Sequence, residues 1–248
     1  MGLSFKKLDG VYLDCFVNLS KQIYKMATVS SKIPKYNFER CDKTFVETTF
    51  GISRVENLPV LTDWINSKNA ETVNDFEEKI LEIARKKASL RINDWNEETL
   101  KLSFISTILN LAEFDGKNYS AFADEKLEAN FGNLILTGKI DWLVAKGLYK
   151  PQTPYLFFHE YKRTKQSSSD PDGQLLAEMV AARFLNKNPE ETMYGIVVWG
   201  KEWYFMNLKN DEYAISKSLD STVKEDLFDI FKILKSSKTI IEERLLRE

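Results

Sequence analysis

Two apolar runs, each interrupted by an acidic side chain, constrain the fold of this chain most strongly. Residues 134–145 read LILTGKIDWLVA, and residues 155–162 read YLFFHEYK. Their length and their β-branched and aromatic content predict two buried β-strands. A charged group inside such a strand is costly unless it is paired or bound to a cation. The carboxylates of Asp141 and Glu160 therefore require partners in the folded protein.

Successive side chains of a strand point to opposite faces of its sheet. Glu160 and Lys162 are consequently expected on one face of the second strand, and His159 and Tyr161 on the other. If the two strands are neighbours, Asp141 and Glu160 converge at one end of the sheet and can share a divalent cation. The pattern Glu-X-Lys alone is a weak indication, because an ordinary ion pair at a strand end has the same sequence.

From residue 97 onward the sequence predicts an alternation of helices and strands. Helices are expected at residues 97–112, 174–185 and 222–245. The predicted strands are residues 122–129, 134–145, 155–162, 193–199 and 203–208. Consecutive strands that then meet a helix predict a mixed sheet with helices on its faces, which is an α/β (α+β) fold.

Residues 1–92 differ in character from residues 93–248. The sequence predicts a mainly helical N-terminal region followed by a separate domain. Apolar residues recur at helical spacing over residues 9–28. Residues 29–73 are predicted to be irregular, with a short helix at residues 61–66.

A charged amphipathic helix is predicted over residues 72–90. Thr72 and Asp75 resemble a helix start signal. The apolar side chains that recur at helical spacing, and are expected to face the core, are Phe76, Ile80, Ile83 and Ala84. Farther along the chain, Asp172 is expected to cap the helix at residues 174–185.

The residue types present narrow the chemistry. His159 is the single histidine, which excludes zinc sites built from several histidines. No GxxxxGK[ST] loop is present to cradle phosphates. With 37 acidic residues, any metal is expected to be a hard cation, Mg²⁺ or Mn²⁺, held by oxygen atoms. The net charge of -2 argues against a surface covered in basic residues but allows a local basic patch.

Location is predicted from the cysteines and from the length of the apolar runs. Cys15 and Cys41 are too few for a disulfide framework and are expected as reduced thiols, with a single bridge between them as the alternative. No apolar run approaches the ~18 residues that a membrane span needs, and no signal core opens the chain. The sequence therefore predicts a soluble, cytoplasmic protein without a membrane partner.

The order of these motifs resembles the PD-(D/E)XK nuclease superfamily, whose core is helix, three strands, helix, strand. GKIDWLVA resembles the strand with the first acidic residue, Asp141, and HEYK resembles the (D/E)XK element of Glu160 and Lys162. NEETLKLSFISTIL resembles the opening helix, in which a glutamate near the start faces the metal site, here Glu97. GQLLAEMVAA resembles the helix after the third strand, with Gln174 at a polar position near the phosphate.

The resemblance covers roughly residues 97–208 and has two departures. Ile140 stands where many members have a proline before the first aspartate. Glu178 stands where some members have the tyrosine of a Gln-X-X-X-Tyr motif that begins here at Gln174. The Gln-X-X-X-Tyr motif of those exonucleases is therefore incomplete in this chain.

The resemblance implies a restriction-endonuclease-like core and a nuclease that hydrolyses phosphodiester bonds of DNA or RNA with Mg²⁺ (or Mn²⁺). The implied metal ligands are Asp141, Glu160, the backbone carbonyl of Tyr161, and Glu97. Lys162 would then activate the water or stabilise the transition state, and Gln174 would assist near the phosphate. His159 points away from Glu160 and is expected to be a packing residue.

A short basic run adjoins this group of residues. Arg163 and Lys165 follow Lys162, and Lys146 lies in the region before the second strand. A role in binding nucleic-acid phosphates and a role as solvated loop charge are equally compatible with the sequence. The alternative function is a non-catalytic nucleic-acid-binding or protein-interaction subunit that retains the nuclease fold. The sequence leaves open a homodimer or a complex with a partner subunit.

Overall fold

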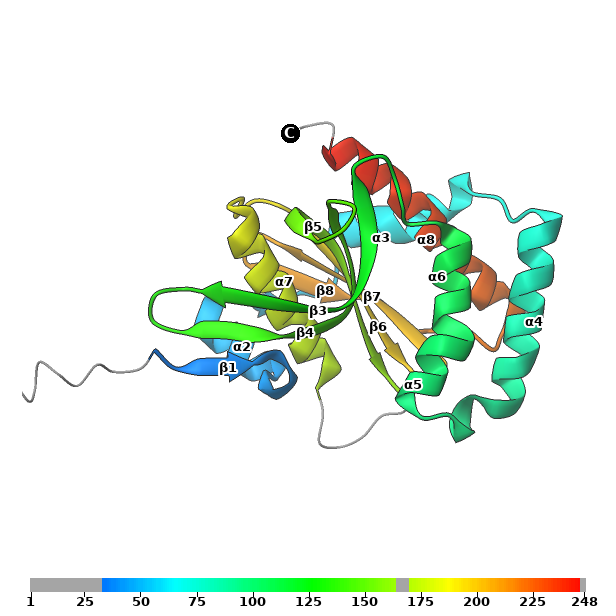
Figure 1. The fold of residues 1–248 in the computed structure, drawn as a ribbon, viewed down its shortest axis with the longest axis horizontal. Coiled ribbons are helices and arrows are strands. Elements are labelled where there is room, and N and C mark those ends of the chain that lie inside the picture. The colour runs from blue at the N-terminus through cyan, green and yellow to red at the C-terminus, as the bar shows by residue number, and fades with distance from the viewer. Residues whose placement is uncertain (1–32, 164–169, 246–248) are drawn as a thin grey trace, which may run out of the picture. The chain divides into compact units, whose positions relative to one another are not determined.

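The strands of this protein build one mixed sheet with nine strands among the residues that the computed structural model describes, 33–163 and 170–245 (Figure 1). The strands are β1 (Lys35–Asn37), β2 (Ser53–Arg54), β3 (Tyr119–Asn130), β4 (Ile135–Lys146), β5 (Gln152–Lys162), β6 (Met193–Trp199), β7 (Glu202–Lys209), β8 (Glu212–Ile215) and β9 (Leu219–Asp220). Their order is β1-β4-β5-β6-β7-β8-β2, with β3 also paired to β4 and β9 to β7. Strands β5 and β6 are parallel, whereas β4 runs antiparallel to both β3 and β5.

Helices cover both faces of this sheet. They are α2 (Lys43–Phe50), α3 (Pro59–Asn66), α4 (Asp75–Arg91), α5 (Glu97–Leu100), α6 (Ser106–Ala112), α7 (Pro171–Asn186) and α8 (Lys224–Leu245). Short 3-10 turns are Phe38–Arg40, Ser67–Ala70 and Ile92–Asp94. A π-helical segment, Lys101–Ile105, joins α5 to α6. The predicted α/β class with a mixed sheet is confirmed at this level.

The two faces of the sheet belong to two hydrophobic cores. On one face, side chains of α3, α4, α5, α6 and α8 pack against Trp142, Phe157 and Trp203. On the other face, α2 and α7 pack against Phe158 and Val197. A sheet buried on both faces needs strands that are apolar on both sides, which explains the nearly continuous apolar runs of the sequence.

Strand β4 changes its partner along its length. Its first residues pair with β1, from Ile135 to Thr137, and its last residues pair with β5, from Trp142 onward. Residues 138–141 of β4 therefore pair with neither β1 nor β5, which leaves a gap between these two strands along one edge of β4. On the opposite edge of β4, Asp124 of β3 has a φ of 57°, which is outside the strand region. Figure 1 shows the β3–β4 hairpin bending away from the rest of the sheet.

The predicted order of elements from residue 97 is confirmed, and β8 and β9 are added to it. The strand at residues 193–199 has the predicted bounds. The predicted cap of α7 is wrong, because Asp170 and not Asp172 accepts the hydrogen bond from Gly173 N. Pro171, which suits the first position of a helix, starts α7 three residues earlier than expected.

Helix α4 forms close to its predicted bounds, but its predicted face is only partly buried: Ala84 is buried and Ile80 is half-buried. Asn74 is the N-cap, in a capping box with Glu77. Phe76 and Ile83 are each 66% exposed. The buried residues of α4 are Glu77, Leu81, Ala84 and Ala88. Glu77 forms an ion pair of 2.9 Å with Lys235 of α8, so the packed face combines this polar contact with Leu81 and two alanines.

The N-terminal part of the described chain is more regular than predicted. Residues 35–54 contain β1, α2 and β2, and the two short strands join the sheet by pairing with β4 and β8. The contacts divide the chain into Met1–Pro34 and Lys35–Glu248, so the predicted division between residues 92 and 93 falls inside the second unit. The predicted helix at residues 9–28 lies outside the described residues. None of the described helices is long and apolar enough to cross a membrane.

Candidate functional site

Asp141 lies where β4 separates from β5. The ladder between the two strands reaches Trp142 and His159, and the N–H of Tyr161 lies beyond it. Asp141 Oδ2 accepts a hydrogen bond from this N–H at 2.9 Å. A buried backbone N–H needs an acceptor, and here a carboxylate replaces the carbonyl of a paired strand. The gap between β1 and β5 thus brings the Asp141 side chain to the end of β5.

Glu160 and Lys162 lie together at the end of β5, on the face that α7 covers. Glu160 is fully buried, and Lys162 Nζ lies 2.6 Å from its Oε1. Gln174 Nε2, from the first turns of α7, donates hydrogen bonds to Glu160 Oε2 at 2.7 Å and to Glu178 Oε1 at 3.1 Å. The two polar residues of α7 are one turn apart and so face the same strand.

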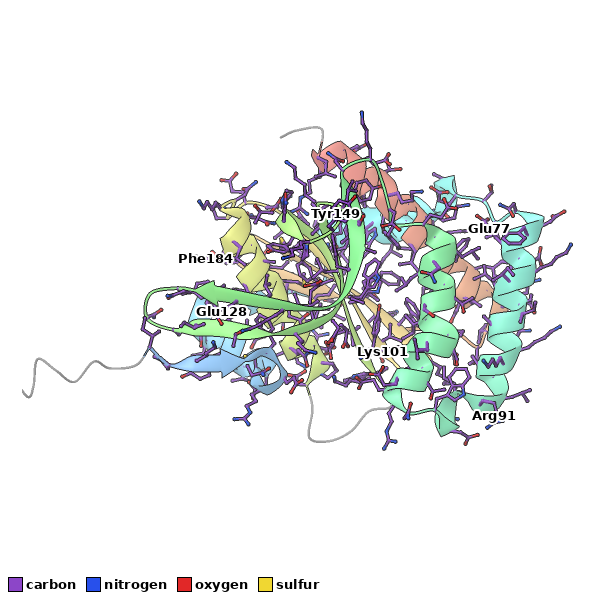
Figure 2. All side chains as sticks on the ribbon, in the orientation of Figure 1. Glu77, Arg91, Lys101, Glu128, Tyr149 and Phe184 are labelled. Carbon is purple, nitrogen blue, oxygen red and sulfur yellow. The ribbon has the colours of Figure 1, made fainter. Side chains whose placement is uncertain are left out.

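Helix α5 adds a third carboxylate to the site. Asn96 caps α5 by accepting from Thr99 N, which places Glu97 in the first turn. Glu97 Oε2 lies 3.8 Å from Lys162 Nζ, and Glu97 Oε1 accepts a hydrogen bond from Lys101 Nζ at 3.0 Å. Lys101 Nζ also donates to Asp141 Oδ1 at 2.8 Å. Figure 2 labels Lys101 on the side of the α5–α6 helix that faces the sheet.

The surroundings of the site shift the pKa values of its buried carboxyl groups and of its lysine Lys101. Burial raises the pKa of Glu160 to about 8, with the charge of Asp141 adding to the rise and Lys162 opposing it. Burial also raises the pKa of Glu178 well above its ordinary range, and the charge of Glu160 adds to this. Burial lowers the pKa of Lys101, but its hydrogen bond to Asp141 outweighs this and the pKa lies above its usual value.

The site residues fit a hard divalent cation in their chemistry. Glu97, Asp141 and Glu160 offer carboxylate oxygens, which Mg²⁺ and Mn²⁺ prefer. In the described part of the chain, no group of three or more acidic, cysteine or histidine side chains is arranged to hold a metal ion. The ammonium groups of Lys101 and Lys162 contact these carboxylates instead. The three carboxylates would have to exchange these ammonium contacts for contacts to the metal.

The other predicted residues lie in different places. Tyr161 contributes its N–H, while its ring is buried on the opposite face of the sheet, in the core with α5 and α6. Arg163 follows Lys162 and is exposed. Lys165 lies outside the described residues. Lys146 is paired with Gln152 at the start of β5, roughly 16 Å along β4 from Asp141 by strand geometry. The structure therefore does not bring Lys146 to the site.

His159 lies on the face of β5 away from Glu160, as its position in the strand predicted. Its ring packs against Trp142, with the ring centroids 4.4 Å apart. Burial lowers the pKa of His159 to about 3, so the ring is neutral at physiological pH. The side chain belongs to the core on that face.

Lys101 is the site residue that sequence reasoning missed. Its signal was its spacing, since it follows Glu97 by four residues and therefore shares its helix face. That spacing alone describes many surface ion pairs, and only the position of β4 beside the helix adds Asp141 as a second partner.

The assembled group brings three carboxylates and two ammonium groups together near the end of β5. Its acidic members come from three separate elements, α5, β4 and β5, and Gln174 reaches it from α7. No family model matches this chain, and no curated protein shows significant similarity to it.

Proposed function

We propose that this chain is a metal-dependent nuclease of the PD-(D/E)XK superfamily, with a restriction-endonuclease-like core, which hydrolyses phosphodiester bonds of DNA or RNA. The observation that carries the proposal is the grouping of Asp141, Glu160 and Lys162 where β4 separates from β5. Glu160 is fully buried among charged groups, and apolar packing alone does not offset the free-energy cost of burying its charge. A helix before the three strands and another after them supply Glu97 and Gln174, in the order that the superfamily pattern implies.

In this proposal Glu97, Asp141 and Glu160 hold Mg²⁺ or Mn²⁺. The cation would supply Lewis acidity toward the scissile phosphate and lower the pKa of the attacking water. Gln174 keeps Glu160 oriented, because its amide donates to one oxygen of that carboxylate. Lys162 keeps a positive charge at the other oxygen, where it can orient the water or stabilise the charge that develops on the phosphoryl oxygens.

The reaction is hydrolysis of a phosphodiester. The water oxygen bonds to phosphorus while the bond from phosphorus to the leaving oxygen breaks, and the leaving oxygen takes up a proton. Arg163, exposed directly after Lys162, is suited to contact a neighbouring backbone phosphate. Such contacts position a strand without reading its sequence, so no base preference follows from them.

The test is cleavage of labelled single- and double-stranded DNA and RNA by the full chain with Mg²⁺, Mn²⁺ or EDTA. Wild type is expected to cut at least one substrate with metal and none with EDTA. Lys162→Ala should lower the rate by about 10²–10³-fold, as expected for loss of one group that stabilises the transition state. The matched control is Lys139→Ala, because Lys139 is an exposed lysine of β4 that pairs with Asp124. The control should cut at the wild-type rate.

Two results would contradict the proposal. One is cleavage that persists in Lys162→Ala at the wild-type rate. The other is the absence of cleavage on every substrate together with no heat of Mg²⁺ or Mn²⁺ binding in calorimetry. The second result would favour a non-catalytic nucleic-acid-binding or protein-interaction subunit that retains the fold.

A further inference from the structure

Lys101 connects two carboxylates that come from different elements. Its Nζ lies 3.0 Å from Glu97 Oε1 and 2.8 Å from Asp141 Oδ1. It also lies 3.8 Å from Glu98 Oε1. An ordinary helix ion pair joins one acid to one base on a single surface. Here one ammonium group lies between two carboxylates, in the position that a bound metal cation would occupy.

The carboxylates that Lys101 joins are the accessible part of the site. The side chains of Asp141 and Glu97 are 19% and 35% exposed, whereas Glu160 is fully buried. An ion that arrives from solvent therefore meets Asp141 and Glu97 first. Lys162 differs from Lys101 in this respect, because its close contact is with Glu160 and its distance to Glu97 is 3.8 Å.

The backbone at Lys101 is held in place while its side chain can move. Lys101 opens the π-helical segment Lys101–Ile105, and such segments are frequent at functional sites. Leu100 and Phe104 on either side are fully buried and anchor the helix on the sheet. A lysine has a long flexible stem and a compact charge, so the ammonium can leave the carboxylates without any shift of the helix.

We propose that Lys101 is an internal counter-cation that occupies the carboxylates of Glu97 and Asp141 in the metal-free protein and competes with the divalent metal for them. This inference rests on the proposed function. Two cations cannot share these oxygens at close range without strong repulsion. Metal therefore binds only when Lys101 has left, and the apparent metal affinity is the intrinsic affinity multiplied by the fraction of metal-free molecules in which Lys101 is released.

The experiment compares Mn²⁺ binding by the full chain in wild type, Lys101→Met and Lys139→Met. Methionine keeps much of the length of the side chain and removes its charge. Calorimetry should give about tenfold tighter Mn²⁺ binding for Lys101→Met, which corresponds to Lys101 occupying the site in roughly nine of ten metal-free molecules. Lys139→Met should bind Mn²⁺ as wild type does, because Lys139 is exposed and pairs with Asp124.

Thermal unfolding provides a second readout that is independent of activity. Without metal, Lys101→Met should melt below wild type, because Glu97 and Asp141 lose their counter-charge. Saturating Mn²⁺ should raise its melting temperature by more than that of wild type. If Lys101→Met does not fold cooperatively, the competition is tested on the wild-type protein instead. Its Lys101 ammonium resonances, assigned by NMR, should shift on Mg²⁺ titration while those of Lys139 do not.

The outcomes separate this inference from the proposed function. Wild-type cleavage with equal or weaker Mn²⁺ binding by Lys101→Met, or an unmoved Lys101 resonance, overturns the role of Lys101 and leaves the nuclease standing. No Mn²⁺ binding and no cleavage by wild type overturns both proposals. Tighter binding by Lys101→Met with an unchanged control supports the competition.

Discussion

Glu160 and Glu178 are two buried carboxyl groups that share one amide donor. Gln174 Nε2 donates to both, and Glu178 Oε2 has no hydrogen-bond partner among the described residues. Ionising Glu178 would place a second negative charge beside Glu160 in a region that excludes water. Burial and the charge of Glu160 therefore raise its pKa well above the ordinary range. We expect Glu178 to hold a proton in the folded protein.

This expectation predicts a pH-dependent effect of Glu178→Gln. In the unfolded chain the carboxyl ionises near its ordinary pKa of about 4.3, whereas in the folded chain it keeps its proton to higher pH. The wild type therefore loses stability as the pH rises from the unfolded pKa toward the raised folded pKa. The variant lacks this loss, which amounts to about 1.4 kcal/mol for each pH unit between the two pKa values.

Urea unfolding at pH 5, 7 and 9 measures the free energy of unfolding for both proteins. The gain of Glu178→Gln over wild type should be smallest at pH 5 and should grow as the pH rises. The exposed Glu113 provides the control, and Glu113→Gln should show no such trend. A stability difference for Glu178→Gln that stays constant across this range would contradict a proton held by Glu178.

At the scale of elements, helix α4 shows that periodicity predicts where a helix forms, whereas packing decides which of its sides is buried. The helix lies close to where its spacing predicts it, although Asn74 and not Thr72 is its N-cap, and Phe76 and Ile83 face solvent. The packed face contains Leu81, Ala84 and Ala88, and small residues there let α4 approach its neighbours. Apolar side chains lie on more than one side of this helix, so the spacing of one stripe could not identify the buried side.

The buried face of α4 can be tested by comparing two alanine substitutions two residues apart. Leu81→Ala removes a fully buried side chain and should lower the free energy of unfolding by about 2–5 kcal/mol. Ile83→Ala removes an exposed side chain and should change it by less than about 0.5 kcal/mol. Chemical unfolding of both variants gives the two values, and equal losses would show that the face is assigned wrongly.

At the scale of the whole molecule, residues before the predicted boundary at 92/93 complete the sheet and both of its cores. Trp64 of α3 makes edge contacts with Phe157, Tyr194 and Phe205, with ring centroids 5.6, 5.1 and 5.1 Å away. These partners belong to β5, β6 and β7. Without α3 and α4, this face of the sheet would lose part of its cover, and Trp64 would be missing from its core.

Truncation at the two candidate boundaries should therefore give opposite results. A chain that starts at Lys35 keeps the second contact unit intact and should unfold cooperatively. A chain that starts at Asn93 loses Trp64 and Leu81 from the core and should be unfolded or aggregated. Circular dichroism and thermal melts of both purified chains decide this. A cooperative melt for the shorter chain would support the boundary predicted from sequence.

The sequence by itself determined the features that depend on near neighbours along the chain. The alternation of β5 placed Glu160 and Lys162 on one face and His159 on the other. Apolar spacing and turn residues predicted the order of elements from residue 97 onward. These signals are local, because a strand repeats every two residues and a helix about every 3.6.

Only the tertiary structure decided the features that depend on contacts between distant residues. The gap between β1 and β5 frees the Asp141 carboxylate to accept from Tyr161, and no pattern within β4 specifies that gap. Lys101 meets Asp141 because α5 lies beside β4, although the two residues are forty positions apart. The buried side of a helix and the partners of a strand are set by the surfaces that pack against them, and those surfaces come together only in the folded chain.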